Sequence, residues 1–289
     1  GRVEQFADGV VRITDNPGEG IITTTFIVLT VRLFLSKFKF NNLFHFAQWA
    51  VIGAAMLVSF NRTHWGVAGL SLVITFFLTN PEQRKKILTW GLYLLWLIPL
   101  AVLPALFFPE SAYGALVQAA INRFSTFFSS TSYVDPTQST IIWRNFEYRY
   151  GFPQIAQNPF FGLGMGAKYR PFISQIDGYG NMGPHYTHNG HLWIAMKAGL
   201  LSWISLITYL VMVIVDGFKK WQRVEDPDKQ SLALGFTLVA VSIILASILH
   251  PIIITFFWTP LLGIIFAVNH LIFKLYLPEE PERLQKPVV

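Results

Sequence analysis

The chain has 289 residues, of which 53% are hydrophobic and only 13% are charged. Soluble domains usually contain about 25% charged residues, so this composition excludes an ordinary soluble protein and indicates one that lies in lipid. The formal net charge is +6 and the chain has no cysteine. The absence of cysteine excludes a disulfide framework and thiolate chemistry.

Stretches of 16 to 25 residues with few or no charges recur along the chain, and about 20 apolar residues cross a bilayer core as a helix. We count seven such stretches: 21–38, 43–60, 65–80, 87–108, 191–215, 232–249 and 252–275. Pro260 favours a kink in the last one. We therefore predict an all-α membrane protein, a multi-span transmembrane helical bundle, as a single domain over residues 1–289 that lacks upstream spans. Residues 109–190 form its one large, partly helical loop.

Basic clusters predict which way the spans run, because short loops rich in Lys and Arg stay on the cytoplasmic side. The clusters are Lys37 with Lys39, Arg84 to Lys86, Lys219 and Lys220 with Arg223, and Lys274 with the C-terminal tail. If seven spans alternate in direction, all four clusters fall on one side. The loop 109–190 and the turns around Arg62 and His250 then face outward, into the periplasm or its equivalent. Topology accounts for most of the positive charge, so no nucleic-acid partner is expected.

Seven of the eight basic residues left on the predicted outer side are arginines. The set comprises Arg2, Arg12, Arg62, Arg123, Arg144, Arg149, Lys168 and Arg170. The planar guanidinium fork binds phosphate oxygens in a bidentate manner, whereas lysine serves as a point charge. The pattern favours an anion-binding outer face. The alternative is that these are solvated loop arginines, balanced by the acidic residues of the same loop.

The segment IIWRNFEYRYGFPQIAQNPFFGLGMGAKYRPF predicts an amphipathic helix, a turn at Asn158-Pro159 and a glycine-rich connection. Arg144 and Tyr148 lie one turn apart on such a helix and share a face. The letters GLGMGA also fit a dinucleotide-binding pattern, but that pattern needs a preceding strand in a βαβ unit. We instead expect these glycines to allow tight turns and a close backbone approach to a neighbour.

The stretch GPHYTHNGHLWIAMKAGL carries His185, His188 and His191 at three-residue intervals. Three histidines could bind zinc, yet on one helix the first and last would face apart, so a metal site requires His185 in a loop. The histidines could also be polar residues at a helix start, or one could act as a general base. Lys197 lies in the apolar segment that follows. Lys197 either has a function, or its ammonium group pairs with a carboxylate or extends to the membrane surface.

The pattern His188-Asn189, nine residues, then Gly199 resembles the signature of the O-antigen ligase and O-antigen polymerase superfamily of membrane glycosyltransferases. FNRTHWG resembles that family's arginine at the outer start of a span. WRNFEY followed by PFFGLGMG resembles its second arginine and Pro-x-x-Gly-x-Gly turn, and RITDNPGEG resembles a motif before an earlier span. The chain departs from the family pattern at Ser202, where a second glycine is common, and at Tyr148, where tryptophan is frequent.

The resemblance implies transfer of a glycan from an undecaprenyl-diphosphate-linked donor to a hydroxyl of lipid A core or another glycan acceptor. It implies a multi-pass protein of the bacterial inner (cytoplasmic) membrane, in contact with membrane lipid, whose active site faces the periplasm. The reaction would invert configuration, with no cofactor and no metal. A polymerase of the same superfamily is one alternative, and a transporter of lipid-linked sugar is another.

The expected roles follow from that chemistry. His188 would be the general base, and Arg62 and Arg144 would bind the diphosphate. Possible substrate contacts are Asn189, Tyr148, Glu147, Arg123 and Arg170. Asn189 would orient His188 or the sugar, and Glu147 is either a rival base or the ion-pair partner of Arg144.

Overall fold

The structure, a computed structural model, describes residues 2–7, 10–14, 18–35, 41–125, 140–173, 183–255 and 258–277. Helices dominate the regular structure of these residues, which confirms the all-α fold class. They are α1 (Gly18–Leu35), α2 (Asn41–Val58), α3 (Arg62–Leu78), α4 (Pro81–Phe107), α5 (Ala112–Ser125), α6 (Thr140–Gln157), α8 (Gly190–Lys197), α9 (Gly199–Lys220), α10 (Pro227–Ala246) and α11 (Trp258–Tyr276).

Five of these helices are long and apolar enough to cross a membrane: α1, α4, α9 with the short turn after it, α10 and α11. Six of the seven predicted spans each overlap one helix, and the span 191–215 covers both α8 and α9. The two that fall outside this set are α2, an apolar helix described in full only from Phe44, and α3, which has 17 residues. The multi-span prediction is therefore confirmed, with five helices of full spanning length among the described residues.

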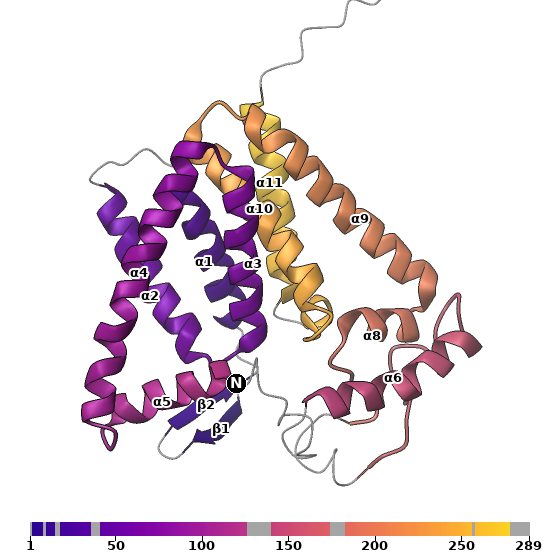
Figure 1. The fold of residues 1–289 in the computed structure, drawn as a ribbon. Helices are drawn as coiled ribbons and strands as arrows, with labels where there is room; N and C mark the ends of the chain where they lie inside the picture. The colour runs from indigo at the N-terminus through magenta and orange to yellow at the C-terminus, as the bar shows by residue number, and fades with distance from the viewer. Residues whose placement is uncertain are drawn as a thin grey trace, which may run out of the picture.

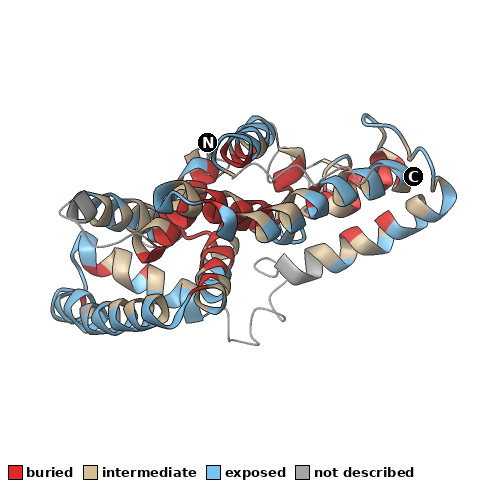
Figure 2. Cartoon of the chain, turned by 90° about the horizontal axis from the view of Figure 1, so that it is seen from above, coloured by how far each residue is buried: buried red, intermediate tan, exposed pale blue. Residues whose placement is uncertain are grey.

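Helix α10 occupies the centre of the bundle and packs against α1, α3, α9 and α11 (Figure 1). Its sequence places small and aliphatic residues on all sides, as expected for a helix surrounded by others. Leu234, Leu238 and Ile243 on this helix are almost completely buried. Figure 2 shows the buried residues gathered along the middle of the molecule. By contrast, α4 and α9 bury little of their surface, so their apolar side chains would contact lipid.

The helix directions place the predicted inner and outer segments at opposite ends of the bundle. The start of α4, the end of α9, the start of α10 and the end of α11 lie at the top of Figure 1, and these ends carry the described basic clusters. At the bottom lie α5, α6 and α8 (Figure 1). The cluster at Lys37 and Lys39 falls outside the described residues. All the described clusters thus share one end, as the positive-inside argument requires.

The predicted span 191–215 is wrong as a single helix, because the chain breaks between α8 and α9. Gly199 adopts φ +85°, and a Cβ there would overlap the carbonyl of Phe160. Only glycine adopts this left-handed conformation without strain. The backbone N–H groups of Leu163 and Gly164 donate to the carbonyls of Met196 and Lys197, the last residues of α8 (2.9 Å each). The glycine-rich segment therefore packs against this break, the close backbone approach that the sequence predicts.

Lys197 lies at the end of α8, where this break places it, and not two turns inside a continuous span. Its side chain is 1% exposed, and its Nζ donates to the carbonyl of Ala167 in the glycine-rich segment. Among the described residues no carboxylate pairs with it. Lys197 therefore connects the glycine-rich segment to α8, a contact that the sequence analysis did not expect.

The last predicted span also differs from the structure. Residues Ile252–Ile254 form a 3-10 turn, and α11 begins at Trp258. Pro260 therefore lies in the first turn of α11, where its missing N–H would have had no intrahelical partner. The kink expected at this proline is replaced by a helix start.

A two-stranded antiparallel hairpin precedes the bundle and is not expected from the sequence. It pairs β1 (Arg2–Ala7) with β2 (Val10–Thr14) and contacts α5. The hairpin lies at the same end of the bundle as α5, α6 and α8 (Figure 1).

Candidate functional site

Glu147 of α6 and His188, which lies just before α8, form a hydrogen-bonded pair. The ring Nδ1 of His188 is 2.6 Å from Glu147 Oε1. The backbone N–H of His188 donates to both carboxylate oxygens, at 3.0 and 2.9 Å. The Glu147 side chain is 9% exposed and that of His188 is 28% exposed. A buried carboxylate thus holds a histidine that solvent can still reach.

The chemistry of this pair determines which ring nitrogen of His188 carries a proton. An ionised carboxylate only accepts hydrogen bonds, so Nδ1 must be the donor to Glu147. In the neutral ring, Nε2 then has a lone pair available to accept a proton. A carboxylate that orients an imidazole and stabilises its protonated form is the arrangement that general-base histidines use.

A second contact joins the same two segments. Asn189 Nδ2 donates to the hydroxyl of Tyr148, one residue after Glu147, at 2.9 Å. The side-chain oxygen of Asn189 accepts from the backbone N–H of Leu192 at 2.9 Å and caps the start of α8. The sequence places an asparagine here because its short polar side chain satisfies an N–H that the first helical turn leaves without a partner. Asn189 therefore fixes the position of His188 relative to α6.

Arg144 lies one turn before Tyr148 on α6. One of its terminal nitrogens donates to the carbonyl of Leu249 at 2.8 Å. Its Nε is buried and has no hydrogen-bond partner among the described residues. Burial lowers the pKa of Arg144, while the nearby Glu147 and Tyr148 raise it. A guanidinium with five N–H groups keeps donors for an anion after the Leu249 contact is made.

Arg62 and Arg123 lie on two other elements, α3 and α5. Arg62 is the first residue of α3, next to Asn61, which caps that helix. Arg123, in the last turn of α5, donates from Nε to the carbonyl of Phe60 at 3.2 Å. Phe60 adopts a positive φ of 53° in the turn that leads into α3. Arg123 thus stabilises the turn that precedes Arg62.

Arg170 is largely buried against aromatic rings. Its guanidinium lies 5.7 Å from the ring centre of Tyr169 and 6.0 Å from that of Phe146 on α6, and it donates to the carbonyl of Pro171 at 3.2 Å. Tyr169 in turn donates to the carbonyl of Tyr186, at 3.1 Å, two residues before His188. Arg170 therefore packs against Phe146, the residue before Glu147, and connects the loop to α6.

The three histidines of the opening pattern do not share a site. His185 is exposed and its Nδ1 lies 3.1 Å from the carbonyl of Ala167. His191 contacts the carbonyl of Ile244 through Nε2, at 2.8 Å, and Trp203 donates to its Nδ1 at 3.3 Å. Within the described chain, these residues form no group that could hold a metal ion. The structure thus gives the metal interpretation of these three histidines no support.

One polar cluster received no role in the sequence analysis. Glu19 at the start of α1, His64 in α3 and His250 after α10 come together inside the bundle. The available signal was an ionisable residue at the edge of a predicted span in each case: Glu19 before 21–38, His64 before 65–80 and His250 between the last two spans. Their proximity could not be read from the sequence, because the three positions are far apart in the chain and lie on α1, on α3 and after α10.

Comparison with known families places these residues in context. The O-antigen ligase family matches residues 47–207, more than half of the chain, and the match includes Arg62, Arg144 and His188. The comparison with curated proteins gives no match. Together with the apolar helices, the family match identifies a multi-pass membrane protein, a glycosyltransferase-type enzyme of polysaccharide assembly with lipid-linked glycan and polysaccharide partners. The chain belongs to the O-antigen ligase family.

Proposed function

We propose that this protein transfers a glycan from an undecaprenyl-diphosphate donor to an acceptor hydroxyl at the periplasmic face of a bacterial inner membrane. The observation that carries this proposal is the Glu147–His188 pair, since Glu147 lies on α6 three residues after Arg144. A base and a diphosphate-binding cation next to one another are what such a transfer requires.

In the proposed reaction, Nε2 of His188 takes the proton of the acceptor hydroxyl as its oxygen attacks the anomeric carbon of the donor sugar. The new glycosidic bond forms while the bond between that carbon and the diphosphate oxygen breaks. The bonding electron pair leaves with the lipid diphosphate. Attack from the side opposite the leaving group inverts the configuration at the anomeric carbon.

The leaving diphosphate develops negative charge that must be stabilised. Arg144, with its buried Nε and remaining N–H groups, supports this role. Arg62 is the second diphosphate-binding residue that we propose, because it is the first residue of α3 and the start of α3 lies at the same end of the bundle as α6 (Figure 1). Two arginines supply here the charge that a divalent metal supplies to leaving groups in other enzymes. No metal takes part in the proposed bond exchange.

Glu147 acts through His188 in this scheme and is not a second base. The buried Glu147 carboxylate accepts hydrogen bonds from both the ring Nδ1 and the backbone N–H of His188. The negative charge of the carboxylate stabilises the imidazolium that forms during attack. Asn189 positions the histidine through Tyr148 and the start of α8. Among the residues expected to contact substrate, Arg123 and Arg170 are better suited to bracing the site than to binding the donor.

The test is transfer by the purified protein from a lipid-linked glycan donor to two separate acceptors. Product on lipid A core supports the ligase reaction that we propose. Extension of a second lipid-linked repeat without product on lipid A core would make the protein a polymerase with the same site. Movement of the donor across the bilayer without any new glycosidic bond would refute the proposal and support a transporter.

A further inference from the structure

A cluster of potential metal ligands lies inside the bundle, apart from the Glu147–His188 pair. Glu19 is in the first turn of α1, His64 is in the first turn of α3, and His250 follows α10. One ligand atom from each of the three lies within 4.8 Å of the other two. No other group of three such side chains meets this limit in the part of the chain that the structure describes.

The spacing of the cluster fits a small divalent cation. His64 Nε2 lies 3.3 Å from Glu19 Oε2. A tetrahedral zinc ion with bonds of about 2.0 to 2.1 Å separates its ligand atoms by roughly 3.3 Å. The His250 ligand atom lies within 4.8 Å of the other two, so it would have to move inward by no more than about 1.5 Å to reach the same separation. Two histidines and one glutamate form a ligand set that zinc uses, with the fourth position left for water.

One polar atom on each of the two innermost ligands lacks the hydrogen-bond partner that buried polar atoms normally have. Glu19 is 7% exposed and His64 is 1% exposed. Within the described residues, Glu19 Oε1 and His64 Nε2 are buried and accept or donate no hydrogen bond, and the 3.3 Å approach of the two side chains does not form one. A buried carboxylate is costly unless a charge or hydrogen bond compensates it. A cation between these atoms would supply that compensation.

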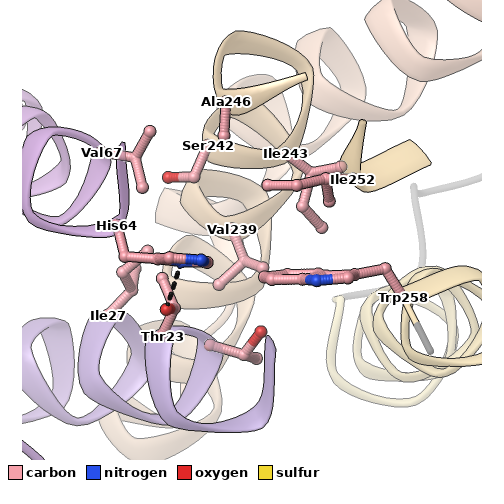
Figure 3. Close-up of a pocket in the computed structure, with 11 residues that line it drawn as sticks. Thr23, Ile27, His64, Val67, Val239, Ser242, Ile243, Ala246, Ile252 and Trp258 are labelled. Atoms are coloured by element: carbon pink, nitrogen blue, oxygen red, sulfur yellow. Dashed lines mark hydrogen bonds between the residues drawn. The ribbon is translucent and has the colours of Figure 1, made fainter. Parts of the chain in front are cut away.

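The surrounding residues hold both ligands in place. Thr23 Oγ1 lies 2.7 Å from His64 Nδ1 (Figure 3), and the other ring nitrogen, Nε2, lies 3.3 Å from Glu19 Oε2. Metal-bound histidines commonly make such a contact through their other ring nitrogen. Asn61 Nδ2 donates to Glu19 Oε2 at 3.1 Å, and the ring of Trp258 stacks on that of His64 at 5.7 Å. The ligands are therefore oriented before any ion binds.

Glycine at position 20 permits this stacking. A Cβ there would lie 2.9 Å from the Trp258 ring, which would have to shift. The cavity beside His64 and Trp258 is small, with about 10 Å³ open to the centre of a water-sized sphere and mostly apolar walls (Figure 3). The cavity on this side of His64 thus admits roughly one water molecule, and Glu19 and His250 are not among the residues that line it.

We propose that Glu19, His64 and His250 bind one divalent transition-metal ion, with zinc as the metal that their ligand set favours. The ion joins the outer ends of α1 and α3 to the segment after α10. Its ligands are near both proposed diphosphate-binding residues, since His64 is two residues after Arg62 and His250 follows the Leu249 carbonyl that accepts from Arg144. The site is separate from the proposed transfer reaction, and its test needs no glycan substrate.

The first test is the metal content of the whole chain, purified in detergent, loaded with Zn²⁺ and passed through metal-free buffer. We expect about one equivalent of zinc per chain, lost in Glu19→Gln, His64→Ala and His250→Ala and retained in the exposed control His185→Ala. The variant His188→Ala should also retain zinc, which separates this proposal from the catalytic one. Zinc at wild-type levels in all three cluster variants, or none in the wild type, would overturn the proposal.

A second variant keeps the proposal testable if those substitutions prevent folding. The chain has no cysteine, so His250→Cys places a single thiol that can replace the imidazole as a ligand. With Co²⁺ added, this variant should develop a thiolate-to-cobalt charge-transfer band that the wild type cannot show. The matched control His185→Cys should lack the band. If the two cysteine variants gave the same spectrum, position 250 would not be a ligand and the proposal would fail.

Discussion

Replacing Glu147 with glutamine removes one negative charge and nearly preserves the shape of the side chain. The carboxylate holds His188 through a 2.6 Å contact to Nδ1 and two contacts to its backbone N–H. The glutamine carbonyl can still accept one of these bonds, but its amide would place N–H groups opposite another donor. A hydrogen bond to a charged group contributes about 1.5 to 3 kcal/mol. If only the ring contact is lost in the transition state, kcat should fall by about 10- to 150-fold.

The assay is turnover of a lipid-linked glycan donor by purified protein, compared with His188→Ala and with the double variant. His188→Ala should lose about 10² to 10⁴ in rate, the usual contribution of a positioned base. The double variant should lose no more than His188→Ala alone, because Glu147 acts through the histidine. Asn145→Ala, an exposed neighbour on α6, is the matched control and should retain wild-type turnover.

Two results would contradict this account of the pair. Wild-type turnover in Glu147→Gln would show that the carboxylate does not orient the base. A further loss when Glu147→Gln is added to His188→Ala would mean that Glu147 contributes independently, as expected if it were itself the base. Donor KM should change little in either single variant, since the proposed diphosphate-binding arginines remain.

Arg62→Ala and Arg144→Ala should each reduce transfer by about 10²-fold or more, with protein levels in the membrane near normal, while the exposed Arg149→Ala stays active. Lysine at either diphosphate-binding position should restore little, because it lacks the bidentate fork; full activity with lysine would contradict phosphate-specific geometry. For orientation, a cysteine at Glu110 should react with an impermeant reagent applied from the periplasmic side, and one at Asp228 should not. Labelling in the reverse pattern would invert the proposed topology.

The sequence by itself determined where most helices lie and how their ends are arranged. A long apolar stretch predicts a spanning helix, because backbone N–H and C=O groups without hydrogen bonds are too costly in lipid and a helix pairs them internally. Clusters of Lys and Arg predict which end of each span is cytoplasmic, because short loops rich in these residues stay on that side. Arg144 and Tyr148 could be placed on one face of α6, and the glycines after it in tight turns, because both follow from short-range backbone geometry. Motif order was sufficient to indicate the family.

Only the tertiary structure decided which residues meet. Glu147 and His188 are 41 residues apart and joined by a loop, so the pair depends on α6 packing against α8. The break at Gly199 is invisible in an apolar run, because it requires the glycine-rich segment to supply the hydrogen bonds that end α8. The Glu19–His64 contact likewise needs α1 beside α3. Hydrophobic pattern specifies how long a helix is and whether it is buried, whereas contacts between distant polar residues arise from how the helices pack.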